Sequence, residues 1–174
     1  DIPTLIADRI AEIGVYRTWS CYLPAEEQKF RAQKIQFYSL ASLEIGITVG
    51  RKNPLFYQEK DSISPESLAG YPVIVYSGQS DGPYSDIFRK LGIPRAHQRI
   101  ATTSRAAIFE YLNTTCGYYL NSIYSDSIYQ SSPETADSRR IFRLENCNIR
   151  SEIGWMKHQD YILSDVAKEF VHGL

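Results

Sequence analysis

The sequence is poor in cysteine and has no excess of either charge. Its 174 residues include 3 cysteines, Cys21, Cys116 and Cys147, which are widely spaced and form no Cys-x-x-Cys pair. This pattern indicates neither a disulfide framework nor a zinc site, and it favours a reducing cytoplasm. Because 19 Lys and Arg stand against 20 Asp and Glu, the formal net charge is only -1. The chain therefore lacks the basic face that nucleic-acid binding requires.

Long apolar segments are also missing. No apolar run approaches the roughly 20 residues that cross a bilayer. The first ten residues, DIPTLIADRI, do not pair a basic segment with an apolar one, as an export signal would. We therefore expect a soluble chain with no membrane association. Because the sequence starts without Met in what looks like a helix, we also expect it to be part of a longer protein.

No catalytic pattern is present. The sequence has no GxSxG elbow, Walker loop or GxGxxG fingerprint. The 3 histidines, His97, His158 and His172, lie in unrelated segments without metal-like spacing. Cys116 has no His and acid partners that the sequence can identify, and a lone Cys usually behaves as a small apolar residue. We therefore predict no enzyme, no cofactor and no metal, and we interpret the chain as a sensing or binding unit.

The segment from Leu43 to Leu120 alternates strand-like and helix-like runs. The strand-like runs are LEIGITVG, VIVYSG and RIATTS. A helix is predicted to start at Pro83 in PYSDIFRKL, and another at Arg105, with Ser104 as its N-cap. The order β, α, β, α, β predicts right-handed crossovers and a parallel sheet. A strand that ends where a helix begins leaves free backbone N–H groups, which bind small polar ligands in α/β proteins.

The segments on either side of this central part predict another lobe. The predicted elements there are a helix over 2–10, strands over 11–16, 140–145 and 151–158, and a closing helix after Ser164. We expect residues 1–16 and 140–174 to form a first subdomain and 17–121 a second, with 122–139 as a return segment and surface loop. A chain that leaves one lobe, builds another and returns makes a hinge, and a hinge between lobes makes a cleft.

The central runs resemble the LysR-type transcriptional regulators. LEIGITVGRKNPLF followed by SISPESLAGYPVIVYSGQ is similar to the strand, NPL- or HPL-like turn, LxGYP helix and strand of their effector-binding domain. TTSRAAIFEYLNTTCGYYLN is similar to the helix and strand that close their second subdomain. IGWMKHQDYILSDVAKEFVHGL is similar to their terminal strand and helix. The resemblance covers the chain from Ile2 onward and is loose from Arg17 to Gln36.

The resemblance implies a fold class: α/β, with two lobes similar to type 2 periplasmic binding proteins. The second lobe would be complete, and the first would lack its N-terminal strand and helix. No winged helix-turn-helix is present, so DNA contact would come only through a domain outside this sequence. A small-molecule effector would bind in the inter-lobe cleft and shift the conformation of the attached DNA-binding domains. The effector would be an anion if it bound at a helix N-terminus. Relatives form homo-oligomers through this domain.

The resemblance also implies effector-binding residues, which lie after strands or at helix starts. They are Tyr16, Arg17, Ser77, Gly78, Thr103, Ser104, Tyr118 and Asn121. The start of the helix at Ser104 could hold a carboxylate or phosphate, although Ser104 could equally serve only as a cap. Arg17 could pair with an acidic effector or remain a solvated charge. The Gly/Ser loop from Ser77 could bind an anion or simply connect two elements.

Two alternatives remain open. A solute-binding protein of a transport system would have the same architecture but would need an export signal. A small α/β enzyme would need a site around Cys116 or Arg17.

Overall fold

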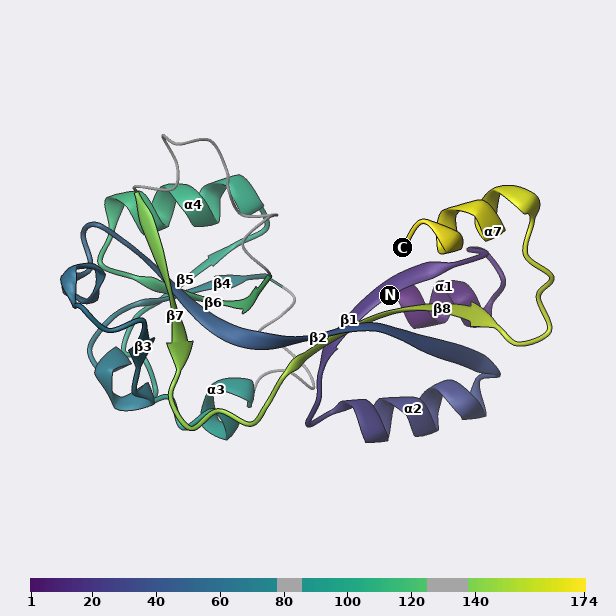
Figure 1. The fold of residues 1–174 in the computed structure, drawn as a ribbon, viewed down its shortest axis with the longest axis horizontal. Coiled ribbons are helices and arrows are strands. Elements are labelled where there is room, and N and C mark those ends of the chain that lie inside the picture. The colour runs from purple at the N-terminus through teal and green to yellow at the C-terminus, as the bar shows by residue number, and fades with distance from the viewer. Residues whose placement is uncertain (78–85, 125–137) are drawn as a thin grey trace. The chain divides into compact units, whose positions relative to one another are not determined.

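The computed structural model describes residues 1–77, 86–124 and 138–174 (Figure 1). The chain forms two compact units. Unit 1 comprises Asp1–Leu43 and Ile149–Leu174, and unit 2 comprises Glu44–Asn148. These bounds differ from those expected from the sequence in two places, because residues 17–43 belong to unit 1 and residues 140–148 belong to unit 2.

Unit 1 is a small antiparallel sheet with helices. Its elements are α1 (Ile2–Ala7), β1 (Gly14–Trp19), α2 (Leu23–Ala32), the first part of β2 (Ile35–Gly50), β8 (Ser151–His158) and α7 (Asp165–His172). β8 is the central strand and pairs antiparallel with both β1 and β2. The core is a cluster of Ile6, Phe30, Ile35 and Met156, so both α1 and α2 contribute an apolar side chain to it.

Two helix starts in unit 1 follow from side-chain caps. The Asp1 carboxylate accepts a hydrogen bond from the Thr4 backbone N–H at 2.9 Å, and Pro3 occupies the first turn, where no N–H is needed. The Ser164 hydroxyl accepts from the Ala167 backbone N–H at 3.2 Å, which confirms the predicted start of α7. The first helix is shorter than predicted, because it ends at Ala7 and Arg9, just past the C-cap Asp8, adopts a positive φ of 58°.

β2 is one strand of 16 residues, so it begins eight residues before the predicted run LEIGITVG. Its register with β8 shifts between Ser39 and Ala41, so a bulge interrupts the strand without ending it. The chain passes between the units within this strand, at Leu43 and Glu44, and again at residues 148 and 149.

Unit 2 is a mixed α/β layer built around the second half of β2. Its other elements are η1 (Pro54–Tyr57), β3 (Ser62–Ile63), η2 (Pro65–Leu68), β4 (Val73–Tyr76), α3 (Ile87–Lys90), β5 (Arg99–Thr102), α4 (Arg105–Thr114), β6 (Tyr118–Ile123) and β7 (Arg139–Leu144). The predicted parallel arrangement is correct for β4, which pairs in parallel with β5 and β6. It is wrong for β2, which runs antiparallel to both β6 and β7.

α4 covers one face of the unit 2 sheet. Ile108 and Leu112 of this helix pack with Ile74 of β4 in a buried cluster. Gly50, at the end of β2, lies so close to α4 that a Cβ at this position would collide with the Leu112 backbone carbonyl. The helix and the strand end can therefore approach only because position 50 has no side chain.

The predicted helix from Pro83 falls partly outside the described residues. The part described is α3, Ile87–Lys90, and Gly92 follows it with a positive φ of 71°, as a helix-terminating glycine does.

Candidate functional site at the carboxyl ends of β4, β5 and β6

Three neighbouring parallel strands of unit 2 end at the same edge of the sheet. Tyr76 is level with Thr102 in the pairing of β4 with β5. The pairing of β4 with β6 sets Ile74 level with Tyr119, so continuing this register places Asn121 level with Tyr76. Because adjacent strands lie about 4.8 Å apart, Thr102 and Asn121 are separated by about 10 Å across β4. A small molecule could reach both.

The start of α4 lies at the end of β5. The Ser104 hydroxyl accepts a hydrogen bond from the Ala107 backbone N–H at 3.4 Å, so Ser104 caps the helix as predicted. The Ser104 backbone N–H donates to the Thr102 hydroxyl oxygen at 3.1 Å. The backbone N–H groups of Arg105 and Ala106 lie in the first turn of the helix. The N–H groups of a first turn have no carbonyl acceptor within the helix. With the positive end of the helix dipole, they favour an anion.

Thr103 and Ser77 lie at this edge as well. Thr103 is exposed between the end of β5 and the cap of α4. The Ser77 backbone N–H donates to the Thr102 carbonyl oxygen at 2.7 Å, which ties the ends of β4 and β5 together. Gly78, the next predicted site residue, lies outside the described residues. The structure thus brings Ser77, Thr103 and Ser104 together, and Asn121 lies on β6, on the other side of β4 from Thr103 and Ser104.

Asn121 projects on the face that α4 covers. In β6, Tyr118, Leu120 and Ser122 are buried and alternate with Tyr119, Asn121 and Ile123, and Tyr119 packs against the α4 cluster. The Asn121 side-chain oxygen is buried, and no hydrogen-bond partner lies among the described residues. A buried acceptor without a donor is costly. A ligand N–H or O–H would satisfy it.

Thr48 is a second acceptor that the sequence interpretation missed. Thr48 of β2 is opposite Tyr119 in the pairing with β6, so it shares a face with Asn121. Its side chain is 5% exposed, and its hydroxyl is buried without a hydrogen-bond partner among the described residues. The signal available in the sequence was a single hydroxyl residue within the apolar run IGITVG.

Tyr118 lies at the opposite end of β6 from this edge. Its side chain is 1% exposed, and burial raises the pKa of its hydroxyl from 10.0 to about 12. It faces away from the side of the sheet on which Asn121 projects.

Tyr16 and Arg17 belong to β1 of unit 1. The Tyr16 hydroxyl donates to a Glu26 carboxylate oxygen at 3.1 Å, and its ring meets Phe30 edge-on with centroids 5.6 Å apart. The Arg17 guanidinium lies over the Trp19 ring, 4.7 Å from its centroid. Both side chains are therefore engaged within unit 1.

The described residues contain no group of three or more His, Cys, Asp or Glu side chains that could hold a metal ion. Among the helices of the described residues, none has the length and apolar character that crossing a bilayer requires. Cys21, Cys116 and Cys147 all lie in the described residues, and no disulfide links them.

Comparisons with known proteins find the fold of this chain in one group of regulators. No family profile and no curated protein sequence matches the chain. The effector-binding domain of QuiR in complex with shikimate superposes with a TM-score of 0.65 at 15% identity, over 97% of this chain and 72% of that one. The regulatory domain of CcmR from Synechocystis PCC6803 in complex with 2-PG gives 0.70 at 13% identity, over 99% and 76%.

Full-length members of the group are longer. CbnR in complex with its target DNA superposes with a TM-score of 0.65 at 13% identity, over 97% of this chain and 53% of CbnR. The chain thus spans about half the length of CbnR. The fold predicted from the sequence is confirmed: the chain has the type 2 periplasmic-binding-protein-like fold of the regulatory domains of LysR-family transcriptional regulators.

Proposed function

We propose that this chain is the effector-binding regulatory domain of a LysR-type transcriptional regulator, with a regulatory rather than a catalytic role. The fold supports the proposal, because it is shared with domains that were solved in complex with shikimate and with 2-PG. A fold alone does not assign a function. The argument therefore depends on the site.

The observation that carries the proposal is the edge formed by β4, β5 and β6. The first turn of α4 offers backbone N–H groups, and Asn121 and Thr48 offer buried oxygens for which the described residues supply no donor. This combination fits a small molecule with an anionic group at one end and hydroxyl or N–H donors about 10 Å away. We expect Ser77, Thr103, Ser104 and Asn121 to contact it. Tyr16, Arg17 and Gly78 stay predictions.

A ligand regulates only through a difference in affinity between two conformations. The chain passes twice between two compact units, so relative motion of these units is the expected conformational variable. Binding at the candidate site would shift this equilibrium, and DNA-binding domains outside this sequence would report the shift. Homo-oligomer formation in the complete regulator and a cytoplasmic location are parts of the same proposal.

Titration calorimetry with a panel of small carboxylates and phosphates, including shikimate and 2-PG, tests the proposal. We expect at least one compound to bind, and Thr103→Phe to weaken that binding about tenfold or more, since the bulky ring would block the start of α4. Thr114→Phe, at the exposed far end of the same helix, is the matched control and should bind normally. If no compound binds, or if Thr103→Phe binds like the parent chain with an unchanged circular dichroism spectrum, the proposal fails.

A further inference from the structure

Two buried oxygens lie next to each other on one face of the unit 2 sheet. In the pairing of β2 with β6, Thr48 is opposite Tyr119 and Gly46 is opposite Asn121. Thr48 and Asn121 are therefore diagonal neighbours on the face that packs against α4, and the side chains of such neighbours start about 7 Å apart. We call the Thr48 hydroxyl and the Asn121 side-chain oxygen the acceptor pair.

Neither oxygen of the acceptor pair has a hydrogen-bond partner among the described residues. Both atoms are buried, and Thr48 as a whole is only 5% exposed. Buried oxygens in native proteins are nearly always hydrogen-bonded, so two neighbouring exceptions need a physical reason. A donor from outside the chain would supply that reason.

The surroundings of the acceptor pair increase the effect of such a donor. A Cβ on Gly46 would lie 2.9 Å from the Asn121 oxygen, so the absence of a side chain at this position lets the Asn121 amide lie against β2. The same Cβ would meet the side chains of Ile123 at 2.7 Å and of Ile141 at 2.9 Å, so apolar groups flank the Asn121 oxygen. A hydrogen bond in apolar surroundings is stronger than one in water, and a missing one is more costly.

The charges of Arg143 and Glu44 on this face neutralise each other. Arg143 of β7 is opposite Gly46, on the same face as Asn121. Its guanidinium donates to the Glu44 carboxylate at 2.8 Å. A cationic donor beside the acceptor pair would lose its water without gaining this carboxylate, which is unfavourable. Neutral hydroxyl groups are therefore the donors that fit the acceptor pair best.

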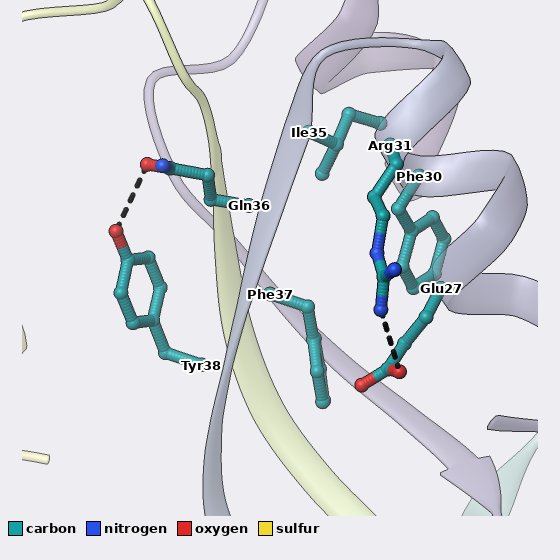
Figure 2. A pocket seen from close by; sticks show the side chains of 7 residues that line it. All are labelled: Glu27, Phe30, Arg31, Ile35, Gln36, Phe37 and Tyr38. Atoms are coloured by element: carbon teal, nitrogen blue, oxygen red, sulfur yellow. Dashed lines mark hydrogen bonds and ion pairs between the residues drawn. The ribbon is translucent and has the colours of Figure 1, made fainter. Parts of the chain in front are cut away.

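A groove in unit 1, between α2 and the start of β2, differs in this respect (Figure 2). The Arg31 guanidinium lies 3.6 Å from the Glu27 carboxylate, and the Tyr38 hydroxyl donates to the Gln36 side-chain oxygen at 2.9 Å. These polar groups of the groove are engaged with one another. The groove therefore does not point to a ligand as the acceptor pair does.

We propose that Thr48 and Asn121 determine which effector the candidate site accepts, by selecting anions that carry hydroxyl groups on adjacent carbons. The inference rests on the proposed function and names the chemical class of the effector: a polyhydroxylated carboxylate or a sugar phosphate, rather than an unsubstituted acid. A single hydroxyl has one proton and satisfies one acceptor, whereas two hydroxyls on adjacent carbons can satisfy both across about 7 Å.

Matched pairs of anions test this selection by titration calorimetry on the whole chain. The pairs are gluconate with hexanoate, shikimate with cyclohexene-1-carboxylate, and glycerol 3-phosphate with propyl phosphate, and the members of each pair differ in their hydroxyl groups. We expect the hydroxylated member of at least one pair to bind about tenfold or more tightly than its partner, because it makes two hydrogen bonds that the other cannot make. The panel also distinguishes a carboxylate from a phosphate as the anionic group.

Thr48→Val and Asn121→Leu remove the acceptors with little change of shape. Each should reduce the ratio of affinities within that pair toward one and leave the affinity for the unsubstituted member unchanged. Thr48→Val should also fold as stably as the parent chain, because it removes a buried hydroxyl to which the described residues give no partner. Thr114→Val, at the exposed far end of α4, is the matched control and should keep the ratio of the parent chain.

The outcomes separate this inference from the proposed function. If no compound of the panel binds, both fail. If compounds bind but the parent chain does not distinguish the members of any pair, or if both variants keep the ratio of the parent chain, only the selection by Thr48 and Asn121 is overturned.

Discussion

The side-chain amide of Asn53 donates a hydrogen bond to the backbone oxygen of Cys116 at 2.6 Å, across 63 residues of sequence. The same side chain accepts from the Leu55 backbone N–H at 2.9 Å and so caps η1. Asn53 is 0% exposed. One buried residue thus fixes the turn after β2 to the segment that leads into β6.

Replacement of Asn53 by alanine should destabilise the chain by about 2 kcal/mol, since it removes both bonds and leaves the Cys116 carbonyl without this donor. Urea unfolding followed by circular dichroism measures the change. Asn113→Ala, an exposed asparagine in α4, is the control and should shift the midpoint little. Equal midpoints for the two variants would contradict the role given to Asn53.

Gly50→Ala should be more damaging. The added Cβ would collide with the Leu112 backbone carbonyl, and a helix backbone cannot yield as a flexible side chain can. We expect a loss of about 3 kcal/mol or failure to fold. Gly173→Ala is the control, since its Cβ would meet nothing nearer than 3.5 Å. A fully stable Gly50→Ala variant would mean that α4 does not pack against this strand end.

Arg140 holds the segment that follows η1. Its guanidinium donates to the Asp61 carboxylate at 2.9 Å and to the backbone oxygens of Phe56, Gln58, Glu59 and Lys60. A lysine has one ammonium group and cannot span this set. Arg140→Lys should therefore speed amide exchange across residues 56–61, as measured by mass spectrometry. Arg89→Lys, at an exposed ion pair with Asp86, should leave that segment unchanged.

Ionisation of the Tyr118 hydroxyl should lower the stability of the chain in alkali. Burial raises the pKa of its hydroxyl from 10.0 to about 12 in the folded chain, so the unfolded chain loses this proton first. The stability that this difference provides is complete below pH 10 and disappears as the pH rises toward 12. Tyr118→Phe should flatten the dependence of the unfolding free energy on pH in that range. An identical slope in both proteins would refute the assignment.

Local signals in the sequence predicted several elements correctly. Ser104 and Ser164 mark helix starts because a side-chain cap is a short-range interaction. The strand over 151–158 agrees with β8. From Gly154 to His158 its buried residues alternate with partly exposed ones, so the pattern is visible without the partner strands.

Features that depend on distant partners were not predictable in this way. The direction of β2 relative to β6 depends on pairing between residues far apart in the sequence, such as Glu44 with Ile123 and Val49 with Tyr118, which no local pattern encodes. The bond from Asn53 to the Cys116 carbonyl has no sequence signature beyond a turn. In α7, Val166 and Phe170 lie on the apolar side of the helix yet are 78% and 48% exposed, because amphipathic spacing does not specify what covers a face.

Only part of the candidate site could be predicted, because some of its residues depend on distant partners. Thr103 and Ser104 could be found because they lie where a strand runs into a capped helix. Thr48 could not, since its importance follows from its place beside β6 on the face of Asn121.

Backbone amide chemical shifts, recorded while the tightest compound of the panel is titrated into the chain, test the central claim most directly. The account predicts that the largest changes occur at Tyr76, Ser77, Thr103 to Ala106 and Asn121, at the carboxyl ends of β4, β5 and β6. Changes confined to other parts of the chain, such as α2 or α7, or no changes with any compound, would contradict it.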